Sequence, residues 1–494
     1  MKGAHIRDLR VAELAGAAQA LLDSGGRMQM VYVWNPPGEA AELRYVATPA
    51  EQPTFEVWRC QLTQEPPSLA TIWPLLGWYE REVMDMHGIR FSDHPEPNRL
   101  VLAQHVPPPL APPGHDGAWV ASPPDGAGIR TLPEVPTEDV QELPFGPVRA
   151  DVLESAEFTF LYIGEQILHY HPHLFFKHRG MEARFQGADP VRGTILAERV
   201  SAVGTVAHAL AYCQAVERAA DCTVPPRACW LRVLLAELER LYNHLHYLGH
   251  LANTTTLKVG DAQGKLLEER AKQINTRLTG SRFLRSLLIP GGLRRDLQPK
   301  SWLSEQLEEV RAETAKYVNH LENSDSHLDR LITTGVLSPK VAFDQGATGP
   351  VQRASAADRD LRRDHPYAAY ADLPLTVPVR QEGDAYARSR VRIEEIDASI
   401  AVMQRVLLLL PEGDIRAPCT PLPMTEGLGW TESPRGTLFY AVHFGPDARL
   451  ARVKIKSPSF SNWRVFPFTV HETNMMDYAI NEASFGLTIS GCAR

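Results

Sequence analysis

The sequence predicts an α+β chain in three parts: a small N-terminal α+β domain, a proline-rich linker and a mainly α-helical body with short flanking strands. Three observations predict this division. Helical and strand-like patterns follow one another near the N-terminus, 11 prolines lie between Pro107 and Pro147, and leucines recur at steps of three and four over residues 231–248. We therefore place the three parts at residues 1–104, 105–144 and 145–494.

The N-terminal domain begins with an amphipathic pattern over residues 7–24, which predicts a helix. Residues 28–34 and 43–48 are rich in β-branched and aromatic side chains, and this pattern predicts two short strands. The proline-rich segment comes later. Because proline lacks a backbone donor and disfavours helix in the residue before it, we expect an extended linker on the surface.

The body is predicted to be largely helical. Residues 158–167 have a short strand-like pattern, and Pro225 and Pro226 then supply the start of the leucine-rich helix. Asp384 is the predicted N-cap of the last of three further helices, which we expect over residues 265–288, 302–333 and 384–410. Short apolar and aromatic runs in the tail predict strands over residues 438–444 and 453–455.

Composition excludes several classes of function. A net charge of −8 without a lysine or arginine run disfavours nucleic-acid binding. The longest aliphatic run, residues 406–410, is far below the roughly 18 apolar residues that span a bilayer. Charged residues interrupt the first 34 positions, so we expect no signal peptide and a cytoplasmic location. Six scattered cysteines without a Cys-x-x-Cys pair indicate reduced thiols and no zinc or iron–sulfur site.

Two sets of motifs carry a resemblance that covers nearly the whole chain. The run Trp78-Tyr-Glu-Arg-Glu-Val-Met-Asp-Met-His-Gly-Ile89 resembles the signature of the short peripheral-arm subunit of respiratory complex I. The body resembles the large subunit of nickel-iron hydrogenases and its complex I counterpart, most closely in the formate-hydrogenlyase branch. The residues that carry this second resemblance include His178-Arg-Gly-Met-Glu182, Glu237-Leu-Glu-Arg-Leu-Tyr-Asn-His244, Gly291-Gly-Leu-Arg-Arg-Asp296 and His365-Pro-Tyr367. The resemblance implies a hydrogenase-large-subunit-like body.

The positions that hold the metal in that family differ in this chain. Ser201-Ala-Val-Gly204 stands where the family has Cys-x-x-Cys, and Cys492 is the one thiol where the second cysteine pair is expected. Neither a hydroxyl nor a hydrogen replaces a thiolate as a soft ligand for nickel and iron. The comparison therefore implies that the chain holds no metal and no cofactor of its own, and we expect no hydrogenase activity.

The quinone position of the complex I counterpart has changed as well. In that family a histidine and a tyrosine are understood to hold the quinone headgroup, and a gap-free placement puts Leu153 and Ala202 at these positions. Neither side chain can donate a hydrogen bond to a carbonyl oxygen. Ser201 could offer one hydroxyl, or it could be a plain helix cap. Quinone is thus left open as a cofactor of the complex.

Residues around these positions are retained. By resemblance, His244 and Arg240 lie near an iron–sulfur cluster of a partner small subunit, where an imidazole that donates to a cluster sulfur tunes the reduction potential. The alternative for His244 is a histidine satisfied within its own chain. Arg179 and Glu182 are similar to a hydrogenase proton relay, and the alternative is a structural ion pair. The resemblance implies that Ser201, Arg353, Arg359 and Asp360 line a cavity. The alternative for the three charged residues is a run of solvated charges.

The resemblance implies a subunit of a membrane-associated oxidoreductase complex, of the complex I (NADH:quinone oxidoreductase) or hydrogenase-4 kind. Expected partners are an iron–sulfur small subunit and membrane-embedded antiporter-like subunits that translocate ions, and NAD(H) would act only through the complex. The chain itself would transfer electrons only with these partners, on the inner face of the cell membrane. A second hypothesis is a non-catalytic structural or coupling subunit that has lost both metal and quinone chemistry.

Overall fold

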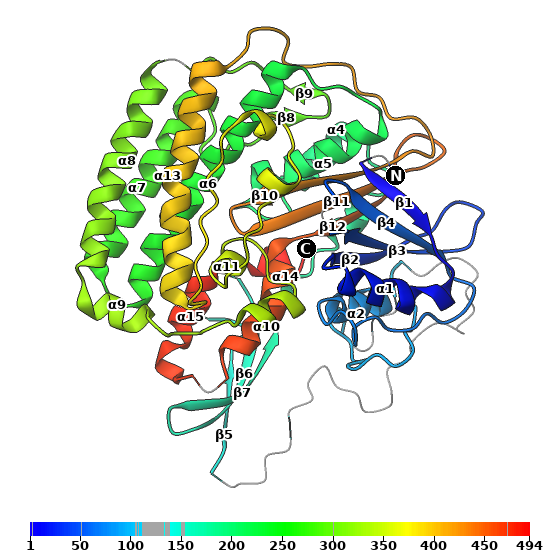
Figure 1. The fold of residues 1–494 in the computed structure, drawn as a ribbon, viewed down its shortest axis with the longest axis horizontal. Coiled ribbons are helices and arrows are strands. Elements are labelled where there is room, and N and C mark those ends of the chain that lie inside the picture. The colour runs from blue at the N-terminus through cyan, green and yellow to red at the C-terminus, as the bar shows by residue number, and fades with distance from the viewer. Residues whose placement is uncertain are drawn as a thin grey trace.

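The computed structural model describes residues 1, 3–50, 52–103, 106, 108–110, 133, 139–149, 154–299, 301–471 and 473–494. Most of the predicted linker and Leu153 therefore lie outside the described residues. Within the described part, helices and small sheets form the two expected units, as Figure 1 shows, and the predicted fold class is confirmed. No described helix is long and apolar enough to cross a membrane.

The small domain is a four-stranded sheet with two helices, α1 (Leu14–Asp23) and α2 (Leu76–His87). Its strand order is β1-β4-β3-β2, and only the β1/β4 pair is parallel. The strands are β1 (Ala4–Asp8), β2 (Arg27–Trp34), β3 (Glu42–Thr48) and β4 (Phe55–Gln61). The predictions for β2 and β3 are confirmed, whereas the helix predicted from residue 7 starts only at Leu14. The reason is that residues 4–8 extend along β4 as an edge strand.

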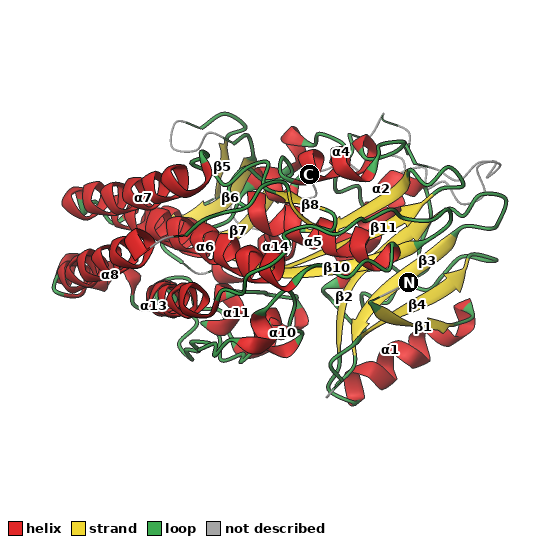
Figure 2. Ribbon diagram, turned by 90° about the horizontal axis from the view of Figure 1, so that it is seen from above, coloured by secondary structure: helices red, strands yellow, loops and turns green. Residues whose placement is uncertain are grey.

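A bundle of long helices forms one side of the body. Figures 1 and 2 show four of them side by side, and the leucines of the central helix have almost no exposed surface. The helices are α6 (Pro226–Thr254), α7 (Lys258–Thr279), α8 (Ser301–Glu322) and α13 (Ala385–Leu409). Asp384 caps α13 as predicted, because its carboxylate accepts a hydrogen bond from the backbone N–H of Ala387 at 2.7 Å.

Two of the predicted helices in the body have wrong boundaries. The helix expected over residues 265–288 already begins at Lys258. The helix expected to reach residue 288 ends at Thr279, because Gly280 takes a left-handed conformation with φ of 71°. The helix expected over residues 302–333 is divided after Glu322, and a separate short helix, α9 (Asp325–Leu331), follows it. Apolar periodicity continues across both breaks and conceals them from the sequence pattern.

An antiparallel sheet connects the bundle to the small domain. Its strands are β10 (Glu426–Ser433), β11 (Gly436–Phe444) and β12 (Leu450–Lys456). The helix α5 (Thr205–Ala219) lies directly on β10, where a Cβ added to Gly427 or Gly429 would come within 2.0 Å of a helix carbonyl oxygen. On the other side, Trp34 of β2 stacks on His443 with ring centroids 4.5 Å apart. The two units therefore share one continuous core.

Shorter elements complete the body. The strand predicted over residues 158–167 is a hairpin of β6 (Glu157–Ile163) and β7 (Gln166–His173), and β5 (Gln141–Phe145) pairs with it inside the segment predicted as linker. A two-stranded ribbon is formed by β8 (Leu288–Ile289) and β9 (Gly292–Leu293). The remaining helices are α3 (Met181–Arg184), α4 (Pro190–Ala197), α10 (Pro339–Asp344), α11 (Pro350–Arg353), α12 (Leu361–Asp364), α14 (Pro458–Val465), α15 (Tyr478–Phe485) and α16 (Ile489–Cys492).

Candidate functional site

The structure brings together the two segments that the sequence resemblance places at the metal ligands of hydrogenases. One is the loop of residues 201–204 before α5, and the other is α16 near the C-terminus. Arg179 joins them, because one of its terminal nitrogens donates to the carbonyl oxygens of Val200 at 2.5 Å and Ser490 at 3.1 Å. We call the place where the two segments meet the metal-equivalent position.

The side chains at the metal-equivalent position do not fit a nickel–iron pair. The sulfur of Cys492 is buried, and it is the one thiol at a position where the resemblance implies four cysteine ligands. Ser201 and Gly204 supply a hydroxyl and a hydrogen, and α5 begins beyond Ser201 with Gly204 as its N-cap. Among the residues that the structure describes, no group of three or more histidine, cysteine or acidic side chains could hold a metal ion. The helix-cap alternative for Ser201 is wrong.

Next to this position, Glu182 lies in a cluster of buried ion pairs. Its carboxylate is 2.8 Å from Arg452, 3.2 Å from Lys454 and 3.2 Å from Arg494. Burial alone would raise the pKa of Glu182, but these three cations hold it well below its ordinary value. A carboxylate that stays ionised at neutral pH cannot take up a proton there, so these contacts are those of the ion-pair alternative. Arg179 donates to backbone carbonyl oxygens and forms no ion pair with Glu182.

The same cluster joins the small domain to the body. Glu82 of α2 lies in the run that resembles the complex I signature, and its carboxylate is 2.6 Å from Arg494 and 2.7 Å from Lys454. Arg494 is therefore held between an acidic side chain from each unit, Glu82 and Glu182. We call Glu82, Glu182, Arg452, Lys454 and Arg494 the paired cluster.

His244 and Arg240 lie in a second buried network, between α6 and α13. His244 is 1 % exposed and its Nε2 is 2.7 Å from a carboxylate oxygen of Glu395. Arg353 bonds the other oxygen of Glu395 at 2.5 Å and reaches Glu432 at 3.0 Å. Neither His244 nor Arg240 is open to the surface, so His244 is satisfied within the chain. The network, which we call the core network, comprises Glu237, Arg240, His244, Arg353, Asp360, Arg362, Glu395 and Glu432.

In the core network four carboxylates share three guanidiniums. Burial, together with repulsion from Asp360, raises the pKa of Glu432 to about 7. Burial lowers the pKa of His244 to about 4 although Glu395 opposes the shift, so the imidazole is neutral at neutral pH. Glu432 is therefore the member that exchanges a proton near neutral pH. Sequence reasoning missed Glu395 and Glu432, because each lies in an ordinary helical or strand pattern.

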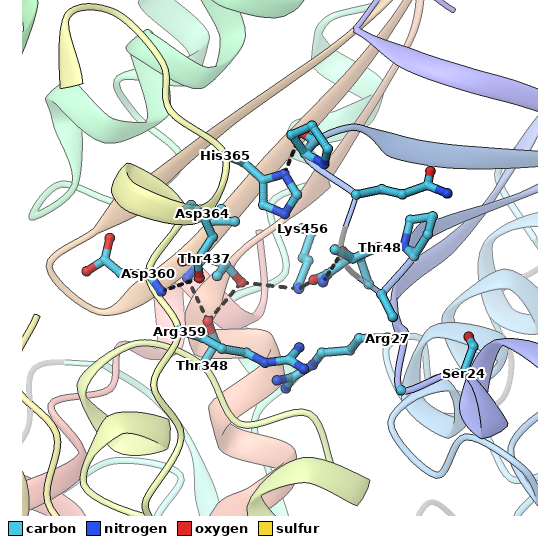
Figure 3. Close-up of a pocket in the computed structure, with 17 residues that line it drawn as sticks. Ser24, Arg27, Thr48, Thr348, Arg359, Asp360, Asp364, His365, Thr437 and Lys456 are labelled. Atoms are coloured by element: carbon cyan, nitrogen blue, oxygen red, sulfur yellow. Dashed lines mark hydrogen bonds between the residues drawn. The ribbon is translucent and has the colours of Figure 1, made fainter. Parts of the chain in front are cut away.

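A cavity of about 670 Å³ lies between the small domain and the body, as Figure 3 shows. Arg359 and Asp360 are on its wall. Ser201 and Arg353 do not line this cavity, because Arg353 is fully enclosed in the core network and Ser201 lies at the metal-equivalent position, and their predicted role at a cavity stays a prediction. Sequence reasoning also missed two buried cations of this wall, Arg27 and Lys456. A signal was present in the alternating basic residues in and beside the strand predicted over residues 453–455, which are Arg452, Lys454 and Lys456.

Comparison with known families agrees with this architecture. Residues 266–421 and 419–494 match the family described as respiratory-chain NADH dehydrogenase, 49 Kd subunit, and residues 10–113 match the 30 Kd subunit of the same enzyme. Residues 179–277 match the nickel-dependent hydrogenase family. The fold and these matches define the class as large subunits shared by hydrogenases and complex I.

Individual relatives make the assignment specific. The chain is 31% identical to formate hydrogenlyase subunit 5 of Escherichia coli (strain K12), over 84% of this chain and 74% of the relative, and 31% identical to hydrogenase-4 component G of the same organism, over 84% and 73%. It is 27% identical to the C/D subunit of NADH-quinone oxidoreductase from Rhodopseudomonas palustris (strain BisB18), over 82% and 78%. The chain therefore belongs to the family of formate hydrogenlyase and hydrogenase-4 large subunits, to which the C/D subunit of NADH-quinone oxidoreductase is related.

A solved structure supports the same assignment. The chain matches a subunit in the structure of the membrane-bound sulfane sulfur reductase, an archaeal respiratory membrane complex, with a TM-score of 0.68 and 25% identity. The match covers 73% of this chain and all of that subunit. The resemblance that the sequence motifs predicted is thus confirmed.

Proposed function

We propose that the chain is a peripheral subunit of a membrane-associated oxidoreductase complex related to complex I and hydrogenase 4, and that it shapes the protein surroundings of an iron–sulfur cluster held by a partner small subunit. The names of its relatives support this proposal, since they are components of formate hydrogenlyase, hydrogenase 4 and NADH-quinone oxidoreductase. Membrane attachment would come from antiporter-like partner subunits. The proposed units are residues 1–104 and 145–494, joined by the linker.

The donor set at the metal-equivalent position carries the proposal. Arg179 holds the two segments together at the backbone, yet the side chains they present include a hydroxyl, a hydrogen and one thiol. One thiol in place of four is too few soft ligands for a nickel–iron pair. The chain would therefore contribute shape and electric field, while electron transfer takes place on groups that its partners hold.

The two buried networks have different roles in this proposal. The core network fixes α6 and α13, and through His244 and Arg240 it sets the field at the face of the body that a partner cluster would approach. Glu432 can take up a proton when a nearby charge changes, because its pKa is about 7. Glu182 would hold Arg494 in place rather than relay protons.

Isolation of the complex with an affinity-tagged copy of this chain would test the proposal. We expect an iron–sulfur small subunit and membrane proteins to copurify, iron in proportion to the clusters, and nickel far below one atom per chain. A monomer free of partners would contradict the assembly. Stoichiometric nickel would contradict the assignment of the metal-equivalent position.

One observation favours the second hypothesis, a non-catalytic coupling subunit. The paired cluster ties the small domain, β12 and the C-terminus together with buried ion pairs, which suits an element that transmits force rather than one that binds a substrate. The two hypotheses differ in the effect of His244→Ala on acceptor reduction by the intact complex. A changed rate with unchanged assembly supports the redox role, and an unchanged rate supports coupling alone.

A further inference from the structure

The cavity between the two units is lined by three basic side chains that face one another. Arg27 comes from β2, Lys456 from the end of β12 and Arg359 from the loop before α12. Figure 3 shows the guanidinium groups of Arg27 and Arg359 meeting at the lower edge of the cavity, with Lys456 above them. Three elements that are distant in the sequence thus place basic side chains in the same cavity.

Two of these cations are almost completely buried without a carboxylate partner in the described part of the chain. Lys456 is 4 % exposed, and its ammonium donates to the amide oxygen of Gln29 at 2.7 Å and to the hydroxyl of Thr437 at 3.2 Å. Arg27 is 5 % exposed and donates to the carbonyl oxygen of Ala347 at 2.7 Å. Neutral oxygens, with the ring of Phe439 at 5.1 Å from Lys456 and the ring of Phe343 at 5.7 Å from Arg27, stabilise the two cations but supply no counter-charge.

The acidic groups nearby are committed to other partners. Asp360 bonds Arg362 at 2.7 Å inside the core network, and Asp364 bonds Arg363 at 2.8 Å on the rim. Glu432 lies behind the wall and is held by Arg353. None of these carboxylates forms an ion pair with the three basic residues of the cavity among the contacts of the described residues. The positive charge at the centre of the cavity is therefore available to a ligand.

The electrostatics agree with this geometry. Burial, followed by repulsion from Arg359, lowers the pKa of Arg27 to about 9. Burial and repulsion from Arg27 likewise lower the pKa of Lys456 well below its ordinary value. In both cases burial is the larger cause and the neighbouring cation adds to it, and a bound anion would oppose the two shifts.

We propose that this cavity binds a phosphate group, either as inorganic phosphate or as the phosphate of a monoester. Two guanidiniums and an ammonium that converge from three elements suit a doubly charged tetrahedral anion, which accepts hydrogen bonds in several directions. The hydroxyl of Thr437 adds a donor, because its oxygen already accepts from Thr348 and Lys456 and its hydrogen is left to point elsewhere. The volume of about 670 Å³ exceeds what one phosphate fills, so the organic part of an ester fits beside it.

Binding to the purified full-length chain in its complex would test this site, with inorganic phosphate and adenosine 5′-monophosphate as the two probes and potassium chloride at matched ionic strength as the reference. We expect saturable binding of phosphate by calorimetry. Tighter binding of the nucleotide would identify a monoester as the ligand, and equal or weaker binding would identify free phosphate. Absence of saturable binding of either probe above the chloride reference would overturn the proposal.

Arg359→Gln is the sharpest variant, because Arg359 is only half-buried and its side chain makes no ion pair among the described residues. We expect about tenfold weaker phosphate binding or more, since one charge-assisted contact is lost. In phosphate-free buffer its melting temperature should stay equal or rise, because one repulsive charge is removed. Lys340→Gln, an exposed charge outside the cavity, is the control. Unweakened phosphate binding, or destabilisation without phosphate, would assign Arg359 a merely structural role and overturn the proposal.

Discussion

Neighbouring basic side chains on one face of a strand lie in different electrostatic surroundings. On β12, Arg452 and Lys454 meet the carboxylates of Glu182 and Glu82 within 2.8 Å. Lys456 lies two residues further along the same face and meets neutral oxygens and the ring of Phe439. All three basic side chains are buried, so the difference lies in the counter-charge and not in exposure to water.

This difference in counter-charge distinguishes a cluster that stabilises the fold from a cavity that binds a ligand. Burial of a charge is costly unless a counter-charge compensates it. In the paired cluster the chain supplies that charge itself, and the ion pairs join the two units. At the phosphate cavity the chain supplies none, and the compensation is left to a ligand. Variants that remove one charge at a time test this distinction.

The largest effect is expected from Glu182→Ala. The substitution leaves Arg452, Lys454 and Arg494 with one carboxylate in place of two, and we expect a loss of about 3–5 kcal/mol in the free energy of unfolding. Chemical unfolding of the full-length chain measures it. The exposed Glu305→Ala is the control and should stay within about 0.5 kcal/mol of the wild type. A loss below about 1 kcal/mol for Glu182→Ala would show that the paired cluster is not structural.

A matched pair of lysine variants compares the paired and the unpaired lysine of β12 directly. Lys454→Met removes a partner of both Glu82 and Glu182, and we expect it to cost about 2–4 kcal/mol. Lys456→Met removes an uncompensated charge at nearly constant side-chain volume, and we expect a change within about 1 kcal/mol in phosphate-free buffer. Equal losses in the free energy of unfolding for the two variants would contradict the distinction between the two lysines.

The core network predicts a dependence of stability on pH. The pKa of Glu432 is raised from 4.5 to about 7, so the folded chain binds its proton more tightly than the unfolded chain. The stability that this group contributes is full below pH 4.5 and is lost as the pH rises to about 7. Glu432→Gln should remove that part of the slope and unfold at higher denaturant concentration than the wild type at about pH 8. Parallel curves for the two proteins across this pH range would contradict the shift.

Local patterns predicted the fold class, the family and several elements. Strands β2, β3, β11 and β12 and the cap at Asp384 follow from alternation and capping chemistry within a few residues. The edge strand β1 was missed because its partner β4 is about 50 residues away and pairs with it in parallel. Such a pairing leaves no signal at the strand itself.

The candidate site was predicted less completely than the fold. The sequence motifs identified His244 and Glu182. The charged partners that influence their protonation, such as Glu395 for His244 and Arg494 for Glu182, come from other elements. Arg27 and Lys456 stand about 430 positions apart, and only folding of the small domain onto the body makes them neighbours. Charge balance is a property of the assembled core, so no single segment contains it.

A smaller loss than in the paired cluster is expected from Arg179→Ala. The side chain is partly exposed and donates to the carbonyl oxygens of Arg199, Val200 and Ser490, so its loss should cost about 1–2 kcal/mol. Because these contacts hold two segments together, hydrogen exchange should accelerate at residues 199–204 and 489–492 and nowhere in the paired cluster.

The exposed Arg192→Ala on α4 is the control for this variant and should leave both segments unchanged. Acceleration that spreads to β12 would show that the metal-equivalent position and the paired cluster open as one unit. Confinement to the two segments would show that Arg179 acts as a local clamp, while the ion pairs of Glu82 and Glu182 independently hold the units together.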